Sequence, residues 1–199
     1  MDKETIAINL YKIGAVKFGE FTLSSGKKSP FYIDLRIIPS FPNTFEQIAK
    51  AYVEIIRNKR LRVSMIIGIA VGGLPIATLV SYMLRKPMIY VRKPKHHGTM
   101  STIEGVIRER NNAVLIDDIA TTGGSLLQAV EKLRDVRVIV KHAIVFIDRE
   151  QGANEKLKEV GVELHSYMTI TELFSILRAE GKIDQETLKR LQIYLKRGG

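Results

Sequence analysis

The sequence predicts an α/β fold in which a mostly parallel sheet is flanked by helices, with a small hood at the N-terminus. From residue 44 onward, short β-branched or apolar runs alternate with stretches of helical periodicity, which is typical of parallel strands joined by crossover helices. Segment 18–38 breaks this alternation, because it is extended, aromatic and rich in turn residues. The 199 residues suffice for one core of ordinary size and contain no repeat or linker. We therefore expect one domain over 1–199, with a hood formed mainly by 1–40.

Apolar spacing and β-branched runs place the individual elements. The helices are expected at 4–13, 44–57, 75–84, 125–134 and 153–160, with two more at the C-terminus. The strands are expected at 64–69, 88–91, 113–116, 136–147 and 163–167. Thr169 and Glu172 have the spacing of a capping box before the first terminal helix, and Asp184 can cap the second.

Composition narrows the functional classes. The chain has no cysteine, which excludes disulfides and thiolate sites, and its four histidines form no HxxxH pattern, so we expect any metal to bring oxygen ligands. A formal charge of +10 suggests a polyanionic partner, which can be nucleic acid, a membrane surface or a phosphorylated small molecule. No apolar stretch reaches the roughly 18 residues of a membrane helix, and the chain opens on Asp2, Lys3 and Glu4. We expect a cytoplasmic protein without a membrane partner.

An acid pair directly follows the third predicted strand. Asp117 and Asp118 precede hydroxyl residues, two glycines and the start of a helix, whose backbone N–H groups can cradle an anion. The segment lacks the GxxxxGK[ST] and GxGxxG spacings, which weakens nucleoside triphosphate and dinucleotide interpretations. Carboxylates beside a phosphate cradle suit a phosphorylated sugar, since they accept hydrogen bonds from vicinal hydroxyls.

The string VLIDDIATTGGS resembles the phosphoribosyl pyrophosphate motif of the type I phosphoribosyltransferases. The resemblance implies the fold of that superfamily, with Asp117 and Asp118 at the ribose and the following loop at the 5′-phosphate. The segment expected to bind phosphoribosyl pyrophosphate comprises Ile119, Ala120, Thr121, Thr122, Gly123, Gly124 and Ser125.

Two further segments point to the base. The string FGEFTLSSGKKSPFYID at 18–34 resembles the N-terminal signature of orotate phosphoribosyltransferases. The resemblance places Tyr32 and Ile33 against the pyrimidine, together with Thr121, and sets Arg149 against the carboxylate of orotate, which an arginine fork matches bidentately. Ser24 departs from the family, in which many members have a lysine.

The run RKPKHHG at 92–98 is similar to the mobile loop of the family, RKxxKxHG, but is one residue shorter. By resemblance this loop closes over the pyrophosphate and reaches into the neighbouring subunit, which implies a homodimer with shared active sites. The residues expected to bind phosphoribosyl pyrophosphate there are Arg92, Lys93, Lys95 and His97, while His96 is unassigned. GIAVGGLP at 68–75 matches the position of the family's pyrophosphate loop, with a plain turn as the competing interpretation.

The resemblance implies an enzyme of pyrimidine biosynthesis, on the route to UMP, that converts orotate and phosphoribosyl pyrophosphate to orotidine 5′-monophosphate and pyrophosphate. It uses Mg²⁺ held mainly by the substrate and water. Two alternatives stay open: a phosphoribosyltransferase for another base, and a phosphoribosyl-pyrophosphate-binding regulator acting on nucleic acid, which would need a continuous basic face. We expect no nucleic-acid partner. The expected catalytic residues are Asp117, Asp118, Lys93, Lys95 and His97.

Overall fold

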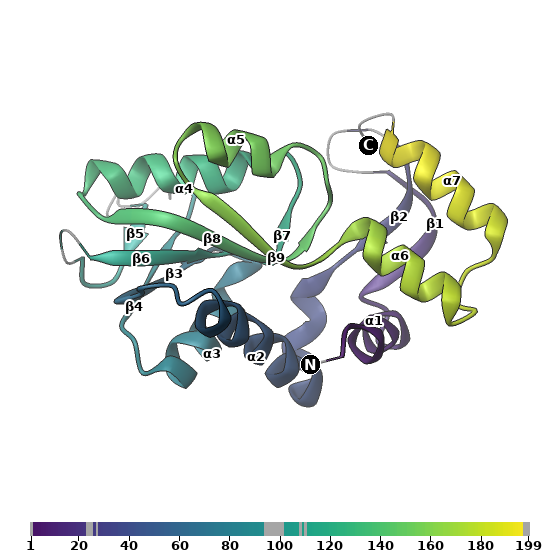
Figure 1. Ribbon diagram of the computed structural model, residues 1–199, viewed down its shortest axis with the longest axis horizontal. Helices are drawn as coiled ribbons and strands as arrows, with labels where there is room; N and C mark the ends of the chain where they lie inside the picture. The colour runs from purple at the N-terminus through teal and green to yellow at the C-terminus, as the bar shows by residue number, and fades with distance from the viewer. Residues whose placement is uncertain are drawn as a thin grey trace.

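The computed structural model describes residues 2–22, 26, 28–93, 102–107, 109 and 111–196. Within them, helices cover both faces of a central sheet, and a smaller hood stands beside it (Figure 1). The strands are β1 Val16–Thr22, β2 Lys28–Ile33, β3 Met65–Ile69, β4 Met88–Val91, β5 Ile103–Glu104, β6 Asn112–Ile116, β7 Ile119–Ala120, β8 Ile139–Asp148 and β9 Glu163–Thr169. The helices are α1 Lys3–Lys12, η1 Leu35–Ser40, α2 Pro42–Asn58, α3 Gly73–Leu84, α4 Gly124–Asp135, α5 Ala153–Glu159, α6 Ile170–Ala179 and α7 Gln185–Lys196.

The central sheet confirms the predicted architecture. Its order is β5-β4-β3-β6-β8-β7, and β9 also pairs with β8. Every pairing in this sheet is parallel except that of β4 with β5. Because parallel strands end at the same edge, the segments after β3, β4, β6 and β8 meet there. The strand expected at 136–147 begins later, at Ile139, because Val136 to Val138 form the turn that ends α4.

Alternate side chains of the central strands enter two separate cores. Ile66, Val114 and Phe146 pack on the α2 and α3 side, whereas Ile67 and Leu115 face α4 and α5. A strand that is buried on both faces has apolar residues at consecutive positions. The continuous apolar runs of the sequence therefore predict these strands. Figure 1 shows the two helical layers above and below the sheet.

The hood contains more of the chain than its N-terminal segment. Strands β1 and β2 form an antiparallel hairpin, and α1, α6 and α7 pack around it (Figure 1). Phe174 of α6 lies at its centre, with its ring centroid 5.0 Å from that of Phe31 and 5.7 Å from that of Phe18. The two ends of the chain therefore build the hood together.

Local signals at the helix ends agree with the sequence. The capping box of Thr169 and Glu172 is present, and the Asp184 carboxylate accepts a hydrogen bond from the Thr187 N–H at 2.7 Å. Glu172 also pairs with Lys3 at 2.9 Å, which links α6 to α1.

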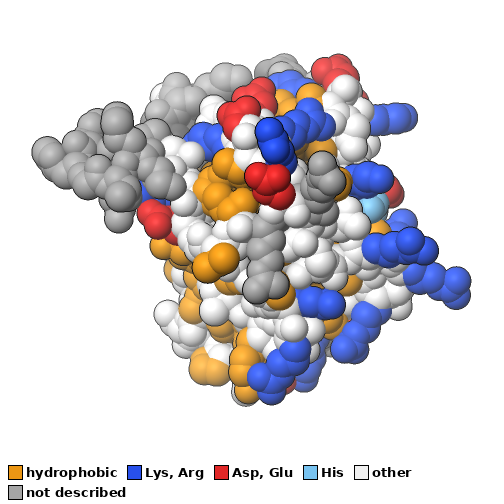
Figure 2. All heavy atoms as spheres, turned by 90° about the vertical axis from the view of Figure 1, so that its left-hand side faces the viewer, with side chains coloured by type: hydrophobic (Ala, Val, Ile, Leu, Met, Phe, Trp, Pro, Cys, Tyr) orange, Lys and Arg blue, Asp and Glu red, His pale blue; other side chains and the backbone are white. Residues whose placement is uncertain are grey.

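Among the described residues, no helix combines the length and apolar character needed to cross a membrane. Lys and Arg side chains gather along one side of the face in Figure 2.

Phe174→Ala should lower the free energy of unfolding by about 3–5 kcal/mol, because it removes a ring that is 1% exposed and touches both strands of the hairpin. Urea unfolding followed by circular dichroism measures this. Ile193→Ala, at a side chain that is 52% exposed on α7, should change the same quantity by less than about 0.5 kcal/mol. Equal effects of the two substitutions would contradict a hood core centred on Phe174.

Candidate active site

A cleft of about 760 Å³ opens at the edge where the parallel strands end, beside the hood. It gathers segments that follow β2, β3, β4, β6 and β8, as expected for a ligand site in an open α/β sheet. The residues that line it are Ile33, Asp34, Leu35, Arg36, Ile69, Ala70, Val71, Gly72, Arg92, Lys93, Asp117, Asp118, Ile119, Thr121, Ser125 and Arg149.

The acid pair forms the floor of this cleft. Asp117 is 7% exposed, and its Oδ1 accepts a hydrogen bond from the N–H of Asp118 at 2.9 Å. The Ile119 N–H donates to Asp118 Oδ1 at the same distance. Burial raises the pKa of Asp117 well above its ordinary value, and the adjacent Asp118 charge raises it further. Burial also raises the pKa of Asp118, an effect that the positive charge of Arg36 opposes. The ligand-free pair therefore holds on to a proton more strongly than exposed carboxyls do.

Two glycines at the start of α3 allow the acid pair to lie where it does. A Cβ on Gly72 would stand 2.2 to 2.6 Å from the carboxylate atoms of Asp118. A Cβ on Gly73 would stand 2.5 Å from the carbonyl oxygen of Ile116 and 2.7 Å from the Asp117 Cα. In the loop that resembles the family's pyrophosphate loop, the two glycines thus permit a close approach to the acid pair. The peptide bond between Ala70 and Val71 is cis.

The expected phosphate loop runs from β7 into the first turn of α4. Gly123 precedes that helix with φ of 79°, and no side chain caps the helix there. The N–H groups of the first turn have no partner inside a helix, so this end is suited to an anion. Thr121 and Ser125 line the cleft, whereas Ala120 is buried in β7 and its carbonyl oxygen accepts the Arg149 N–H at 2.9 Å. Thr122, Gly123 and Gly124 complete the turn between them.

Arg149 enters the cleft from the end of β8 and lies over an aromatic ring. Its guanidinium carbon is 4.8 Å from the centroid of Phe31. Its Nε is buried, and among the described residues it has no hydrogen-bond partner. Burial lowers the pKa of Arg149, and the nearby Tyr194 of α7 opposes that shift. A half-buried guanidinium with an unused donor suits a planar anion such as a carboxylate.

The hood side of the cleft differs in part from expectation. Ile33 lines it, whereas Tyr32 is not among the lining residues. The Tyr32 hydroxyl accepts a hydrogen bond from Arg36 Nη2 at 2.9 Å, and its ring centroid is 5.7 Å from that of Phe21. Arg36 also pairs with Asp34 through its Nε at 2.7 Å, and this hydrogen bond lowers the pKa of Asp34.

The expected pyrophosphate-binding cations are only partly described. Arg92 and Lys93 line the cleft. The Arg92 side chain is 10% exposed and pairs with Glu104 of β5, with Nη2 2.6 Å and Nε 2.8 Å from Oε1. A carboxylate of the same chain therefore holds its guanidinium fork. Ser24, Lys95, His96 and His97 lie outside the described residues.

Asp34 and Arg36 of the cleft, and Tyr194 beside Arg149, were not expected from the sequence. Asp34 and Arg36 follow Tyr32 and Ile33 directly, so the charged string after the hood signature was an available signal. Tyr194 gave no signal, because its place on α7 looks like that of any half-buried position of an amphipathic helix. Only the packing of α7 on the hood brings it to Arg149.

Comparison with known proteins agrees with this geometry. Residues 37–165 match the phosphoribosyl transferase domain. An orotate phosphoribosyltransferase of Staphylothermus marinus is 42% identical over 98% of this chain and 95% of its own length. The crystal structure of orotate phosphoribosyltransferase from Aeropyrum pernix is 38% identical, with a TM-score of 0.80 over 90% of this chain and 99% of that one. The structure of Leishmania donovani UMP synthase is 30% identical, with a TM-score of 0.88 over 99% of this chain and 43% of that one.

The alternating α/β sheet, the acid pair over the α3 glycines and the uncapped start of α4 thus occur in a chain that shares most of its length with these relatives. The chain therefore belongs to the phosphoribosyl transferase family and, within it, to the orotate phosphoribosyltransferases.

Proposed function

We propose that this chain transfers the phosphoribosyl group of phosphoribosyl pyrophosphate to orotate, which yields orotidine 5′-monophosphate and pyrophosphate. The observation that carries the proposal is the half-buried Arg149, which lines the same cleft as the acid pair and whose Nε has no hydrogen-bond partner among the described residues. An acid pair and phosphate cradle alone suit any phosphoribosyl transfer. A guanidinium facing the base side adds a receptor for the carboxylate that distinguishes orotate from other pyrimidines.

The acid pair serves the sugar. Breaking the bond from C1 of the ribose to pyrophosphate builds positive charge on the ribose before the bond to the ring nitrogen of orotate is complete. Asp117 and Asp118 accept hydrogen bonds from the ribose hydroxyls and stabilise that developing charge. Their raised pKa values mean that ionisation is costly at this buried position. Hydrogen bonds from substrate hydroxyls and the charge of nearby cations lower the free-energy cost of ionising the two carboxyls. The negative charge of the acid pair is therefore greatest once the substrate is bound.

The leaving group is met by cations. Lys93 lines the cleft, and Arg92 stands beside it, held by Glu104. From family resemblance, Lys95 and His97 also contact the pyrophosphate. The described cleft offers carboxylate oxygens and neither histidine nor cysteine, a donor set that fits Mg²⁺. Asp118 faces the cleft and can help hold the ion together with substrate oxygens and water. When bound, Mg²⁺ neutralises charge on the departing pyrophosphate.

The proposal includes a homodimer with shared sites. The support is the resemblance of RKPKHHG to a loop that reaches into the neighbouring subunit in this family. Each cleft then combines the acid pair and phosphate cradle of one chain with loop cations from its partner.

Asp118→Asn should lower turnover roughly 100-fold, and Asp117→Asn should lower it less, because the change removes negative charge at the ribose while keeping the shape of the side chain. Steady-state rates measured from the loss of orotate absorbance test this. Glu159→Gln, at an exposed position on α5, should leave turnover unchanged. Wild-type turnover in both Asn variants would reject the proposed ribose contact.

Asp117→Asn should also stabilise the fold at neutral pH. The pKa of Asp117 is raised in the folded chain, so the native state keeps a proton that the unfolded chain releases above about pH 4. Stability is therefore lost as pH rises through the window between the unfolded and folded pKa values. The Asn side chain does not ionise, so the variant does not lose this stability as pH rises. Each unit by which the pKa of Asp117 is raised corresponds to about 1.4 kcal/mol in the free energy of unfolding, or roughly 3–6 °C in Tm for a domain of this size.

Thermal unfolding of wild type and Asp117→Asn between pH 4 and pH 8 measures the effect. The advantage of the variant should shrink toward pH 4, where the carboxyl also begins to take up a proton in the unfolded chain. A variant that is less stable than wild type at every pH would show that Asp117 is not penalised by burial.

Arg149→Lys should raise the KM for orotate roughly 10–100-fold and change that for phosphoribosyl pyrophosphate much less, because an ammonium cannot replace the planar fork that holds the carboxylate. Steady-state kinetics with each substrate varied in turn measure this. Arg190→Lys, exposed on α7, is the matched control and should change neither constant. Equal increases of both KM values would remove Arg149 from the orotate site.

Mixing a Lys95→Ala chain with an Asp118→Asn chain should restore about half of the wild-type activity per heterodimer, because one shared site then receives both lesions and the other receives none. Subunit exchange is confirmed by native mass before the assay. A Lys95→Ala chain mixed with a Lys95→Ala, Asp118→Asn double variant is the control, since neither of its sites is whole. If the mixture of Lys95→Ala and Asp118→Asn chains is no more active than either variant alone, each loop serves its own subunit.

A further inference from the structure

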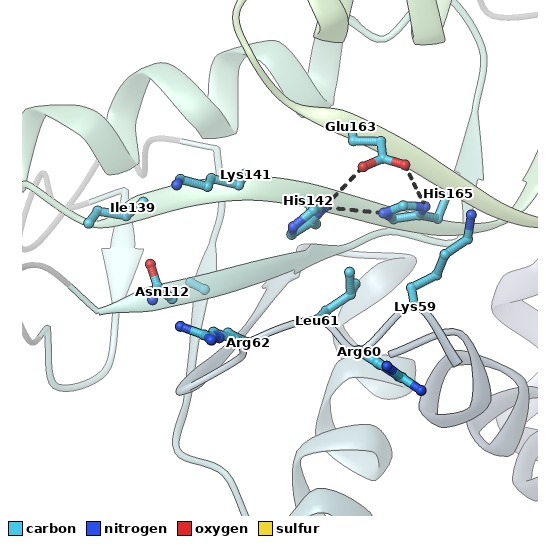
Figure 3. Close-up of a pocket in the computed structure, with 11 residues that line it drawn as sticks. Lys59, Arg60, Leu61, Arg62, Asn112, Ile139, Lys141, His142, Glu163 and His165 are labelled. Atoms are coloured by element: carbon cyan, nitrogen blue, oxygen red, sulfur yellow. Dashed lines mark hydrogen bonds and ion pairs between the residues drawn. The ribbon is translucent and has the colours of Figure 1, made fainter. Parts of the chain in front are cut away.

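A second cluster of polar side chains lies at the opposite end of the sheet from the cleft. His142 is near the start of β8, and Glu163 and His165 are at the start of β9. They line a pocket of about 410 Å³ that also includes the first residue of β6, Asn112. In Figure 3 the three side chains point toward one another across the two strands. None of them takes part in the proposed transfer reaction.

The register of the strands brings the three residues together. His142 is the direct partner of Glu163, and Ile144 is the partner of His165 in the parallel ladder. Residues two apart on a strand share a face, so the three side chains occupy the face that α2 covers farther along. Because α2 ends at Asn58, the sheet lacks its cover here and the strand face becomes polar. The histidines are 23 residues apart, which is why no HxxxH spacing signalled them.

The three side chains lie close enough together to share one metal ion, which each imidazole ring would bind through a single nitrogen. His165 Nε2 and His142 Nδ1 are 3.2 Å apart, and Glu163 carboxylate oxygens lie 3.7 Å from His142 Nδ1 and 3.6 Å from His165 Nδ1. One ligand atom from each residue can be chosen so that all lie within 4.8 Å of one another. Two ligand atoms held at 2.0–2.1 Å by one tetrahedral zinc ion stand about 3.3–3.4 Å apart.

We propose that His142, Glu163 and His165 form a binding site for a divalent transition-metal ion of the zinc class, which clamps β8 to β9. Two imidazoles and a carboxylate are a known zinc ligand set, with the fourth position left to water or an anion. Imidazole nitrogen favours zinc, nickel and copper, whereas Mg²⁺ prefers sites made of oxygen. This site is therefore distinct in place and in chemistry from the Mg²⁺ that accompanies phosphoribosyl pyrophosphate.

Burial supports the assignment. The His165 side chain is 6% exposed, that of His142 is 27% exposed and that of Glu163 is 60% exposed. In a hydrogen bond between two neutral imidazoles, one ring donates its N–H and the other accepts with a lone pair. A metal ion can instead bind a lone pair from each of the two rings. Burial lowers the pKa of His165, so its ring is suited to the neutral form that binds metal. Glu163 is mobile enough in solvent to turn either oxygen toward the ion.

The surrounding charges set the strength of the site. Lys59, Arg60, Arg62 and Lys141 line the same pocket and are exposed. They oppose a bound cation, but water and salt screen exposed charges over roughly 8 Å at physiological ionic strength. They also favour an anion as the fourth ligand. The site should therefore bind its ion less tightly than a closed structural zinc site does, and added salt should strengthen binding slightly.

Titration of the tag-free chain with Zn²⁺ in a calorimeter, without substrates, tests the site. One ion should bind per chain, and Tm should rise by roughly 5–10 °C at a free concentration 100 times Kd. Mg²⁺ at the same concentration should leave Tm unchanged. His142→Gln, His165→Gln and Glu163→Gln should each weaken zinc binding by at least about 10-fold, since even outer-shell partners contribute that much.

The matched control is the double variant His96→Gln, His97→Gln, which removes the other two histidines of the chain and should retain the bound ion. His142→Gln should keep wild-type turnover with Mg²⁺, because its side chain is far along β8 from Arg149. If His165→Gln unfolds, the more exposed His142 and Glu163 variants still decide the question. Absence of zinc binding in wild type, binding unchanged in the cluster variants, or binding lost in the control would each overturn the proposal. Since no substrate is present, this result is independent of the proposed transfer reaction.

Discussion

The close approach of α3 to the acid pair is the constraint on which the site depends. Strands β3 and β6 are adjacent and parallel, so the turn after one meets the turn after the other at the same edge. Gly72 and Gly73 leave no side-chain atoms between them and the two acids. Any Cβ there would displace the carboxylates from the floor of the cleft or lift α3 off the sheet. The position of the acid pair is thus determined by the absence of side chains on the neighbouring strand connection.

Holding the acids in this place makes their ionised forms costly. Asp117 is almost fully enclosed, and Tyr52 donates its hydroxyl hydrogen to the Asp117 carbonyl oxygen at 2.8 Å from below. Partial compensation comes from backbone N–H groups and from the charge of Arg36. Groups with raised pKa values in a cleft are typical of functional sites, because the field they provide is needed only when a substrate is bound. The fold therefore tolerates a destabilising feature, a buried acid pair at the floor of the cleft.

The base side of the cleft depends on both ends of the chain. Arg149 comes from the end of β8, Phe31 beneath it from the N-terminal hairpin, and Tyr194 beside it from the last helix. The hydrophobic contacts of the hood hold these three elements together, with Phe174 at the centre. The surroundings of Arg149 are therefore coupled to the hood, whereas the turn from Thr121 to Ser125 depends on the sheet and the start of α4. At the other end of the same strands, His142, Glu163 and His165 are brought together by strand register alone.

The sequence by itself determined the features that depend on neighbours along the chain. The apolar runs identified the strands, and the spacing of Thr169 and Glu172 identified a helix start. The order of residues from Asp117 to Ser125 predicted a segment whose acid pair and hydroxyls line the cleft. Each of these signals spans a few residues, because backbone geometry and helix ends are local. Only the tertiary structure decided the pairing of Arg92 with Glu104, the stacking of Arg149 on Phe31 and the meeting of His142 with His165. Those contacts join residues from different elements, and they exist because sheet register and helix packing set distances that no local pattern encodes.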